Sequence, residues 1–168
     1  MPMPINKVQT TAASAHHAHK MSAYLAGQLK PYDDRATLKM FGEDDNGLAR
    51  VGTRNGPVAS LTPESVAKVL GFKMETQAEL DDRVQQFQKV DAKNKDFWPN
   101  FIDTQEEAGV GDKVKALMTG KNVAELAAFV IDGGEHDRQP FGADAFLMAR
   151  MKDGSVAYLR GTVGGMCY

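Results

Sequence analysis

The sequence predicts an α+β fold: a small antiparallel sheet built from an N-terminal and a C-terminal β-hairpin, with four to five helices packed mainly on one face. Short apolar runs flank turn-forming residues near the N-terminus and again near the C-terminus, and these two observations predict the strands. A third predicts the helices, because apolar residues recur every three or four positions through the middle. At 168 residues, with 42% hydrophobic residues, the chain is long enough for one hydrophobic core.

Residues 1–32 differ in charge from the rest and are predicted to form a polar leader ahead of a single globular domain at residues 33–168. The leader contains three lysines but no Asp or Glu, so all 22 acidic residues lie in the predicted domain. Acid-poor, Ser/Thr-rich composition is typical of the uncleaved signals of bacterial contact-dependent secretion, and also of flexible termini. A transit peptide is less favoured, because such peptides use arginine and the first arginine here is Arg35.

The first predicted elements are a short helix and a hairpin. Apolar residues at helical spacing predict an amphipathic docking helix that ends near Pro31. These residues are Ala18, Met21, Leu25 and Leu29. Residues 37–41 and 48–52 then flank the turn formers EDDNG, and they predict the N-terminal hairpin.

The middle of the chain carries the clearest helix signals. The helix predicted over residues 61–71 has Thr62 as its cap and a proline in its first turn. A longer helix is predicted from Thr76, where Glu79 completes a capping box, to about Val90.

The next segment, KNKDFWPNF, predicts a connector whose aromatic side chains plug the core. These side chains are Phe97, Trp98 and Phe101. Shorter helices are predicted at residues 112–118 and 122–130, the second opened by an asparagine cap.

The C-terminal region changes to strand periodicity. Residues 145–151 and 156–163 flank a turn at Asp153 and Gly154, which predicts the C-terminal hairpin. Apolar residues fall on both faces of the first of these two runs, so we expect a central or covered strand.

The net charge, the length of the apolar runs and the cysteine count disfavour several classes of function. A formal net charge of −2 gives no field for binding nucleic acid, so we expect another protein as the partner. No run reaches the roughly 20 apolar residues that cross a bilayer, and the first thirty residues lack the apolar core of a secretory signal peptide. One cysteine cannot form an internal disulfide. No motif predicts a cofactor.

The strongest chemical candidate is the charged, Gly-rich loop DGGEHDRQPFG. A histidine between carboxylates is a candidate acid or base, and loops on rigid elements often carry catalytic groups. The residues are Glu135, His136, Asp137 and Arg138. A solvated connection is the alternative interpretation of the same loop.

Two further candidates involve sulfur and imidazole. Cys167 would be a hydrolase nucleophile if His136 were oriented toward it with Asp137 or Asp144 behind, although a thiol one residue from the end of the sequence favours an inert role. The segment TTAASAHHAHK holds three of the four histidines. It lacks the third and fourth ligands of a usual metal site, so no metal is predicted.

The leading functional hypothesis is therefore an interaction protein that is delivered or assembled through its leader. The composition favours a bacterial secreted virulence effector that acts by protein binding, made in the bacterial cytoplasm before non-classical secretion into a target cell. One alternative is a virion or other assembly subunit. The other is a small hydrolase or transferase that uses the Glu135–Arg138 loop.

Overall fold

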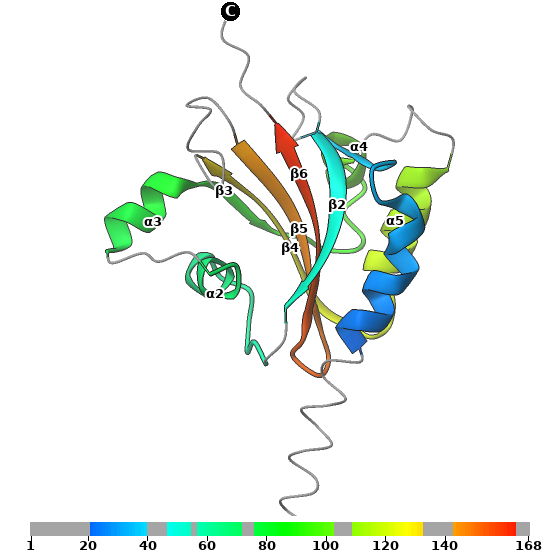
Figure 1. The fold of residues 1–168 in the computed structure, drawn as a ribbon, viewed down its shortest axis with the longest axis horizontal. Coiled ribbons are helices and arrows are strands. Elements are labelled where there is room, and N and C mark those ends of the chain that lie inside the picture. Colours follow the sequence, from blue (N-terminus) through cyan, green and yellow to red (C-terminus); the bar gives the residue numbers. More distant parts are fainter. Residues whose placement is uncertain are drawn as a thin grey trace, which may run out of the picture.

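A computed structural model describes the protein in six stretches of chain (Figure 1). These are residues 21–39, 47–54, 57–71, 76–102, 109–132 and 143–163. They form a six-stranded antiparallel sheet with accompanying helices, which confirms the predicted α+β class.

The sheet has the strand order β1-β2-β6-β5-β4-β3, so the two predicted hairpins meet where β2 pairs with β6. Strands β4, β5 and β6 form a meander, and β1 and β3 are the edges. The strands are β1 (Thr37–Leu38), β2 (Gly47–Arg54), β3 (Val84–Lys89), β4 (Val123–Asp132), β5 (Ala143–Met151) and β6 (Val156–Val163).

Helices lie on both faces of the sheet, with the larger group on one of them (Figure 1). The helix at residues 21–29, which we call the first helix, shares a face with α4 and α5, whereas α2 and α3 lie on the opposite side. The other helical segments are the 3-10 turn η1 (Lys30–Tyr32), α2 (Pro63–Val69), α3 (Gln77–Arg83), α4 (Phe97–Phe101) and α5 (Val110–Met118).

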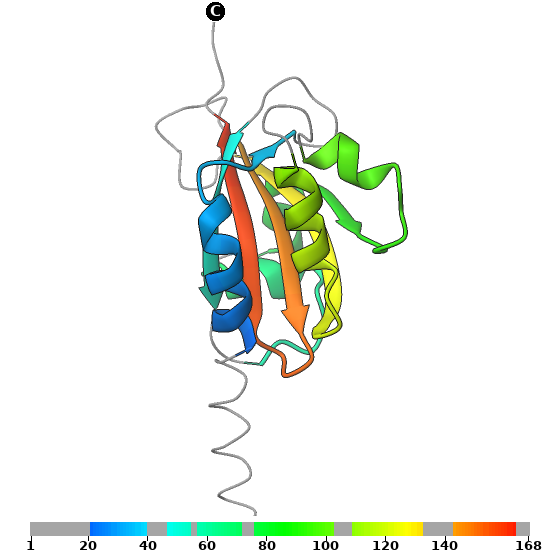
Figure 2. The ribbon, with the colours of Figure 1, turned by 90° about the vertical axis from the view of Figure 1, so that its right-hand side faces the viewer.

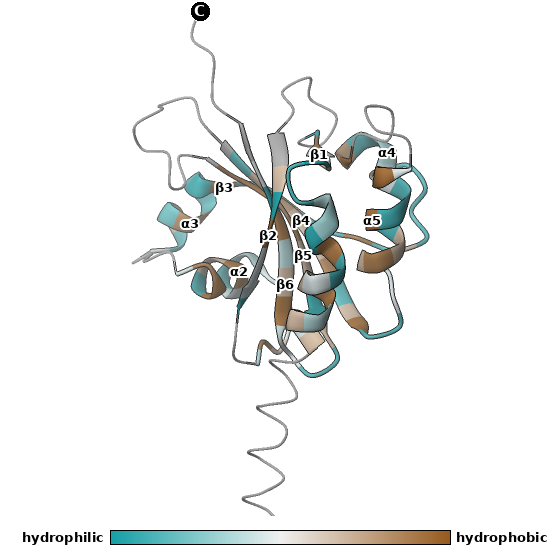
Figure 3. Ribbon diagram, turned by 45° about the vertical axis from the view of Figure 1, so that its right-hand side comes forward, coloured by the Kyte–Doolittle hydropathy of each residue, from teal (hydrophilic) through white to brown (hydrophobic). Residues whose placement is uncertain are grey.

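The larger hydrophobic core lies between one face of the sheet and the layer formed by the first helix, α4 and α5 (Figure 3). Leu25 and Leu29 of the first helix are 3% and 0% exposed and pack in the same cluster as Leu147 and Leu159 of the central strands. The predicted docking of this helix is confirmed. The predicted domain boundary between residues 32 and 33 stays a prediction.

The smaller core lies on the opposite face, under α2. Leu61 and Val66 are fully buried there against Phe129 and Phe146, whose rings stack with centroids 4.9 Å apart. The helix signals that start at Thr62 are confirmed, because its hydroxyl accepts a hydrogen bond from the N–H of the third helical residue.

The aromatic connector also folds as predicted. Phe97, Trp98 and Phe101 are all buried in the larger core, at 5%, 3% and 0% exposure, and they form the short helix α4. The Phe97 and Phe101 rings stack at 5.1 Å.

The prediction of a helix at residues 122–130 is wrong, because this segment is strand β4. Ala127 and Ala128 point to opposite faces and both are fully buried. A short run that is apolar on all sides fits a buried helix and a buried strand equally well. Backbone pairing with β3 and β5 on either side decides for the strand.

The prediction of one long helix from Thr76 to Val90 is also wrong in its second half. The capping box at Thr76 and Glu79 is present, but α3 ends at Arg83 and β3 follows. A bulge between Val84 and Gln86 puts one extra residue into β3. Val84 and Phe87, three residues apart, therefore pack against the same core, and their spacing imitates a helix.

The C-terminal hairpin and its central strand are confirmed. β5 pairs with β4 and β6 and is buried on both faces, as its apolar pattern predicts. Gly154 in the turn has φ of +89°, a left-handed conformation that favours glycine. On the next strand Tyr158 lies over its cross-strand partner Gly52, where a Cβ would come within 2.4 Å of the ring.

Candidate functional site

The residues predicted as a catalytic site lie outside the described part of the chain. These are Glu135, His136, Asp137, Arg138 and Cys167. The predicted leader histidines at residues 16, 17 and 19 also lie outside it. The catalytic interpretation therefore stays a prediction, and so does the expectation that the leader histidines hold no metal.

The described strands do show where the two predicted catalytic segments join the sheet. Residues 133–142 connect the end of β4 to the start of β5, and Cys167 lies four residues after the end of β6. Ala143 pairs with Asp132 on one side and with Val163 on the other. Both segments therefore attach at the same end of the sheet, on adjacent strands.

Asp144, which was predicted as an alternative to Asp137 in the Cys167 hydrolase hypothesis, is an ion-paired residue of the sheet. Its side chain is 1% exposed, and its Oδ2 accepts a hydrogen bond from Arg160 at 2.8 Å. The guanidinium of Arg160 lies 5.9 Å from the centre of the Phe146 ring. Burial with a paired cation gives Asp144 a structural role in joining β5 to β6.

Two kinds of feature, a metal-binding group and a membrane-spanning helix, are absent from the described stretches. No three His, Cys, Asp or Glu residues there are grouped so that they could hold a metal ion. No helix in the same stretches is long and apolar enough to cross a membrane.

An apolar groove of about 760 Å³ lies between the first helix and α5. Figure 2 shows the two helices side by side over the sheet, with β5 and β6 visible between them. We call this feature the helix groove. Its walls are Met21, Tyr24, Leu25 and Gln28 from the first helix and Ala116 and Leu117 from α5, and Val123 and Met151 reach it from the sheet.

The rim of the helix groove is aromatic and cationic. Tyr24 is 68% exposed, and it is the one large hydrophobic side chain so exposed in the described stretches. Among the described residues, Lys121 is the single charged one that lines the groove, together with the amide side chains of Gln28 and Asn122. An apolar groove with a few polar groups at its rim is typical of a binding site.

The local structure holds both walls in place. The backbone N–H of Ser22 in the first helix donates to Ser155 Oγ at 3.1 Å, and that hydroxyl donates to Asp153 Oδ1 at 2.7 Å. The β5–β6 turn is thus tied to the first helix. At the other wall, the Thr119 hydroxyl donates to the Lys115 carbonyl at the end of α5.

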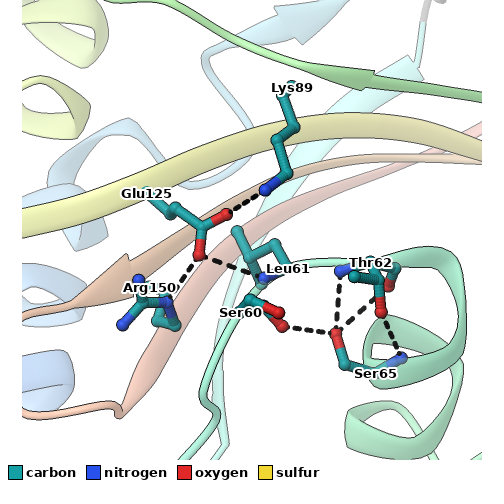
Figure 4. Close-up of polar contacts among 7 residues, drawn as sticks. All are labelled: Ser60, Leu61, Thr62, Ser65, Lys89, Glu125 and Arg150. Carbon is teal, nitrogen blue, oxygen red and sulfur yellow. Dashed lines mark hydrogen bonds and ion pairs between the residues drawn. The ribbon is translucent and has the colours of Figure 1, made fainter.

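A polar network at the far side of the sheet is centred on Glu125 of β4 (Figure 4). Its carboxylate accepts hydrogen bonds from Lys89 at 2.7 Å, from Arg150 at 2.9 Å and from the backbone N–H of Leu61 at 3.2 Å. The network joins three neighbouring strands to the segment that leads into α2.

Hydrogen bonding keeps Glu125 ionised. Burial by itself would raise the pKa of this carboxyl, but the hydrogen bonds from Lys89, Arg150 and Leu61 outweigh burial, and its pKa lies below the ordinary value. A carboxylate held by three donors is a poor proton acceptor at neutral pH. The Glu125 network is therefore a structural clamp rather than acid–base machinery.

Comparison with models of protein families finds no match to this chain, and comparison with curated proteins finds no related sequence. Its function therefore has to be argued from the geometry of its own residues.

Sequence reasoning predicted both helices that form the walls of the helix groove, but not the groove itself. The spacing of Met21, Leu25 and Leu29 indicated a docking helix, and residues 112–118 indicated the second helix. Nothing in the local pattern places these two helices beside each other, since β-strand order decides that. The sequence did contain one indication of the exposed aromatic residue: Tyr24 directly precedes Leu25, which belongs to the apolar face of the helix, so Tyr24 falls off that face.

Proposed function

We propose that this chain is a protein-binding module whose helix groove receives an amphipathic helix from a partner protein. The observation that carries the proposal is an apolar groove beside the most exposed aromatic side chain of the described chain, Tyr24. Tyrosine is enriched at the energetic centres of protein interfaces, because it buries a large ring and keeps a polar tip.

The shape of the groove favours a helix as its occupant. The first helix and α5 form its two walls, and residues of the sheet reach its floor. A third helix laid between them would place apolar side chains at positions i, i+3 or i+4 and i+7 against Leu25, Leu117 and Met151. It would extend the helical layer on this face of the sheet.

Charge complementarity favours an acidic partner helix. Lys121 lies in the lining of the groove, and none of the lining residues that the structure describes is a carboxylate. A glutamate or aspartate near one end of the partner helix would meet this lysine at the polar rim. Complementary rim charges of this kind raise the association rate and fix the orientation of the bound helix.

The N-terminal segment fits the proposal as a delivery or assembly segment. Residues 1–20 lead directly into Met21, which lines the helix groove, and they contain no acidic residue. We propose that this segment directs either secretion from a bacterial cell into a target cell or incorporation into an assembly. The groove then binds the partner at the destination.

The test uses two designed peptides of about 16 residues, long enough to be partly helical in water. Both carry leucines at helical spacing, and one has glutamates where the other has lysines. Fluorescence anisotropy with the full chain should show tighter binding of the acidic peptide. Tyr24→Ala should weaken it about tenfold, as expected for loss of an aromatic interface anchor.

Charge reversal gives the matched control. Lys121→Glu should weaken binding of the acidic peptide severalfold and strengthen binding of the basic one, whereas Lys113→Glu, at an exposed position of α5 outside the groove, should change neither. Equal binding of both peptides to all variants would contradict the proposal. So would failure of both peptides to shift the NMR signals of the groove residues.

A further inference from the structure

The edge strand β3 has the properties of a second binding surface. The opposite edge of the sheet, β1, has only two residues, whereas β3 has six. The side chains of Gln85, Gln86, Gln88 and Lys89 are exposed along it. A long edge strand presents backbone groups to which another strand can pair.

The alternation of hydrogen bonds along β3 shows which of its backbone groups face away from β4. The N–H of Val90, just after β3, donates to the Leu126 carbonyl of the neighbouring chain segment at 2.8 Å. Inward and outward residues alternate along an antiparallel strand, so Gln88 faces β4 with its backbone while Phe87 and Lys89 face away. Among the described residues, no backbone hydrogen bond outside the sheet ladder uses Phe87 or Lys89.

A hollow of about 220 Å³ lies beside this edge, between β3 and α4. We call it the edge pocket. Its lining combines amide side chains and one carboxylate with the rings of two buried phenylalanines. These residues are Gln88, Asn94, Asp96, Phe97, Asn100 and Phe101.

The chemistry of the edge pocket fits a cationic side chain. Asp96 is exposed and the described residues give it no ion-pair partner. The buried rings of Phe97 and Phe101 form an apolar wall of the pocket. A guanidinium group donates up to five hydrogen bonds, which the Asp96 carboxylate and the side-chain amide oxygens of Gln88 and Asn100 can accept.

Strand geometry connects the outward backbone with the edge pocket. The side chain of Gln88 is on the sheet face of its partner Ala128, which belongs to the larger core, and Phe87 is on the other face, against Phe129. A strand added outside β3 would place the residue opposite Gln88 on the same face, next to the edge pocket. Its two neighbours would lie on the face of Phe87.

We propose that the β3 edge binds an extended peptide by strand addition and that the edge pocket receives an arginine side chain of that peptide. The main-chain bonds to Phe87 and Lys89 supply affinity, and the pocket beside Asp96 supplies specificity. The preferred pattern is apolar, arginine, apolar. This surface is separate from the helix groove, since the two share no lining residue.

The test is an NMR titration of the full chain with three capped peptides: Thr-Val-Arg-Val-Thr, the same peptide with Glu for Arg, and the arginine peptide with N-methylated valines. The arginine peptide should shift the amide signals of Phe87 and Lys89 and bind at least about tenfold tighter than the other two. Asp96→Asn should remove most of its advantage over the glutamate peptide. Asp82→Asn, an exposed position of α3 outside the pocket, should have no effect.

Three results would overturn the proposal. The first is equal binding of the arginine and glutamate peptides, which would remove the role of Asp96. The second is full binding by the N-methylated peptide, which would exclude strand addition. The third is equal affinity for acetyl-arginine amide alone, which would leave a side-chain pocket without a role for the β3 backbone.

Discussion

At the scale of single residues, Glu125 connects separate parts of the described fold. Its carboxylate contacts side chains from two other strands and the backbone before α2. Both Glu125 and Arg150 have side chains that are 18% exposed, so their ion pair is only partly screened by water. Lys89 is 59% exposed and contributes less.

We predict that Glu125→Gln lowers the free energy of unfolding at pH 7 by about 1–3 kcal/mol, because Arg150 loses a charged partner. The folded-state pKa of Glu125 is below its unfolded value. Its contribution to stability is therefore present above the unfolded value of about 4.3 and is lost as the pH falls through the folded pKa. Urea unfolding at several pH values measures both effects.

The variant should consequently lose less stability than the wild type between about pH 5 and pH 3. Glu64→Gln, at an exposed position in the first turn of α2, is the control and should cost on the order of 0.5 kcal/mol through the helix dipole. If both variants have the same pH profile, the Glu125 clamp makes no measurable contribution.

At the scale of elements, the sequence predicted those whose signals are local. The caps at Thr62 and Thr76 act within three residues, and the turn at Gly154 needs only its own φ angle. The Glu125 contacts could not be predicted, because Leu61 and Glu125 are 64 residues apart in sequence. Such partners become neighbours only after the strands are ordered.

The two wrong elements show the same limit. Residues 122–130 have no periodicity that separates a buried helix from a buried strand, and their pairing with two strands decides the outcome. In residues 84–90, one bulge shifts the apolar positions by a single residue and imitates a helix. The candidate catalytic residues could be chosen from the sequence by type alone, and their arrangement stays a prediction.

The first helix gives an element-scale prediction. Leu29→Ala should lower the free energy of unfolding by about 2–5 kcal/mol, since Leu29 is 0% exposed and its removal leaves a cavity in the larger core. Tyr24→Ala, on the same helix but 68% exposed, should stay within about 0.5 kcal/mol. Chemical denaturation compares the two. A cost below about 1 kcal/mol for Leu29→Ala would make this helix a peripheral attachment.

At the scale of the whole molecule, the two faces of the sheet carry different layers. One face buries the larger core under the first helix, α4 and α5, and the other buries a smaller aromatic core under α2. The proposed helix groove belongs to the first layer and the proposed strand addition to the edge. The two proposals therefore concern non-overlapping surfaces and partners of opposite charge.

Truncation tests the proposed leader at this scale. Deleting residues 2–20 should leave the unfolding free energy within about 0.5 kcal/mol, because every described residue of the two core clusters remains, but it should abolish delivery or assembly. Deleting residues 2–30 should destabilise the fold, because Leu25 and Leu29 are lost. Differential scanning calorimetry compares the two truncated proteins. Equal melting temperatures would show that the first helix is dispensable.

The bond between Ser22 and Ser155 also sets how the molecule should respond to a mechanical pull from its N-terminal side. Tension applied at Met21 reaches the first helix before any strand, and the Ser22 link to the β5–β6 turn is the first tether in its way. Once that hydrogen bond breaks, β1 and β2 separate from the sheet next, and the paired strands β4, β5 and β6 separate last. A translocating motor that gripped this end would therefore work against the periphery first and meet its greatest resistance at the centre of the sheet.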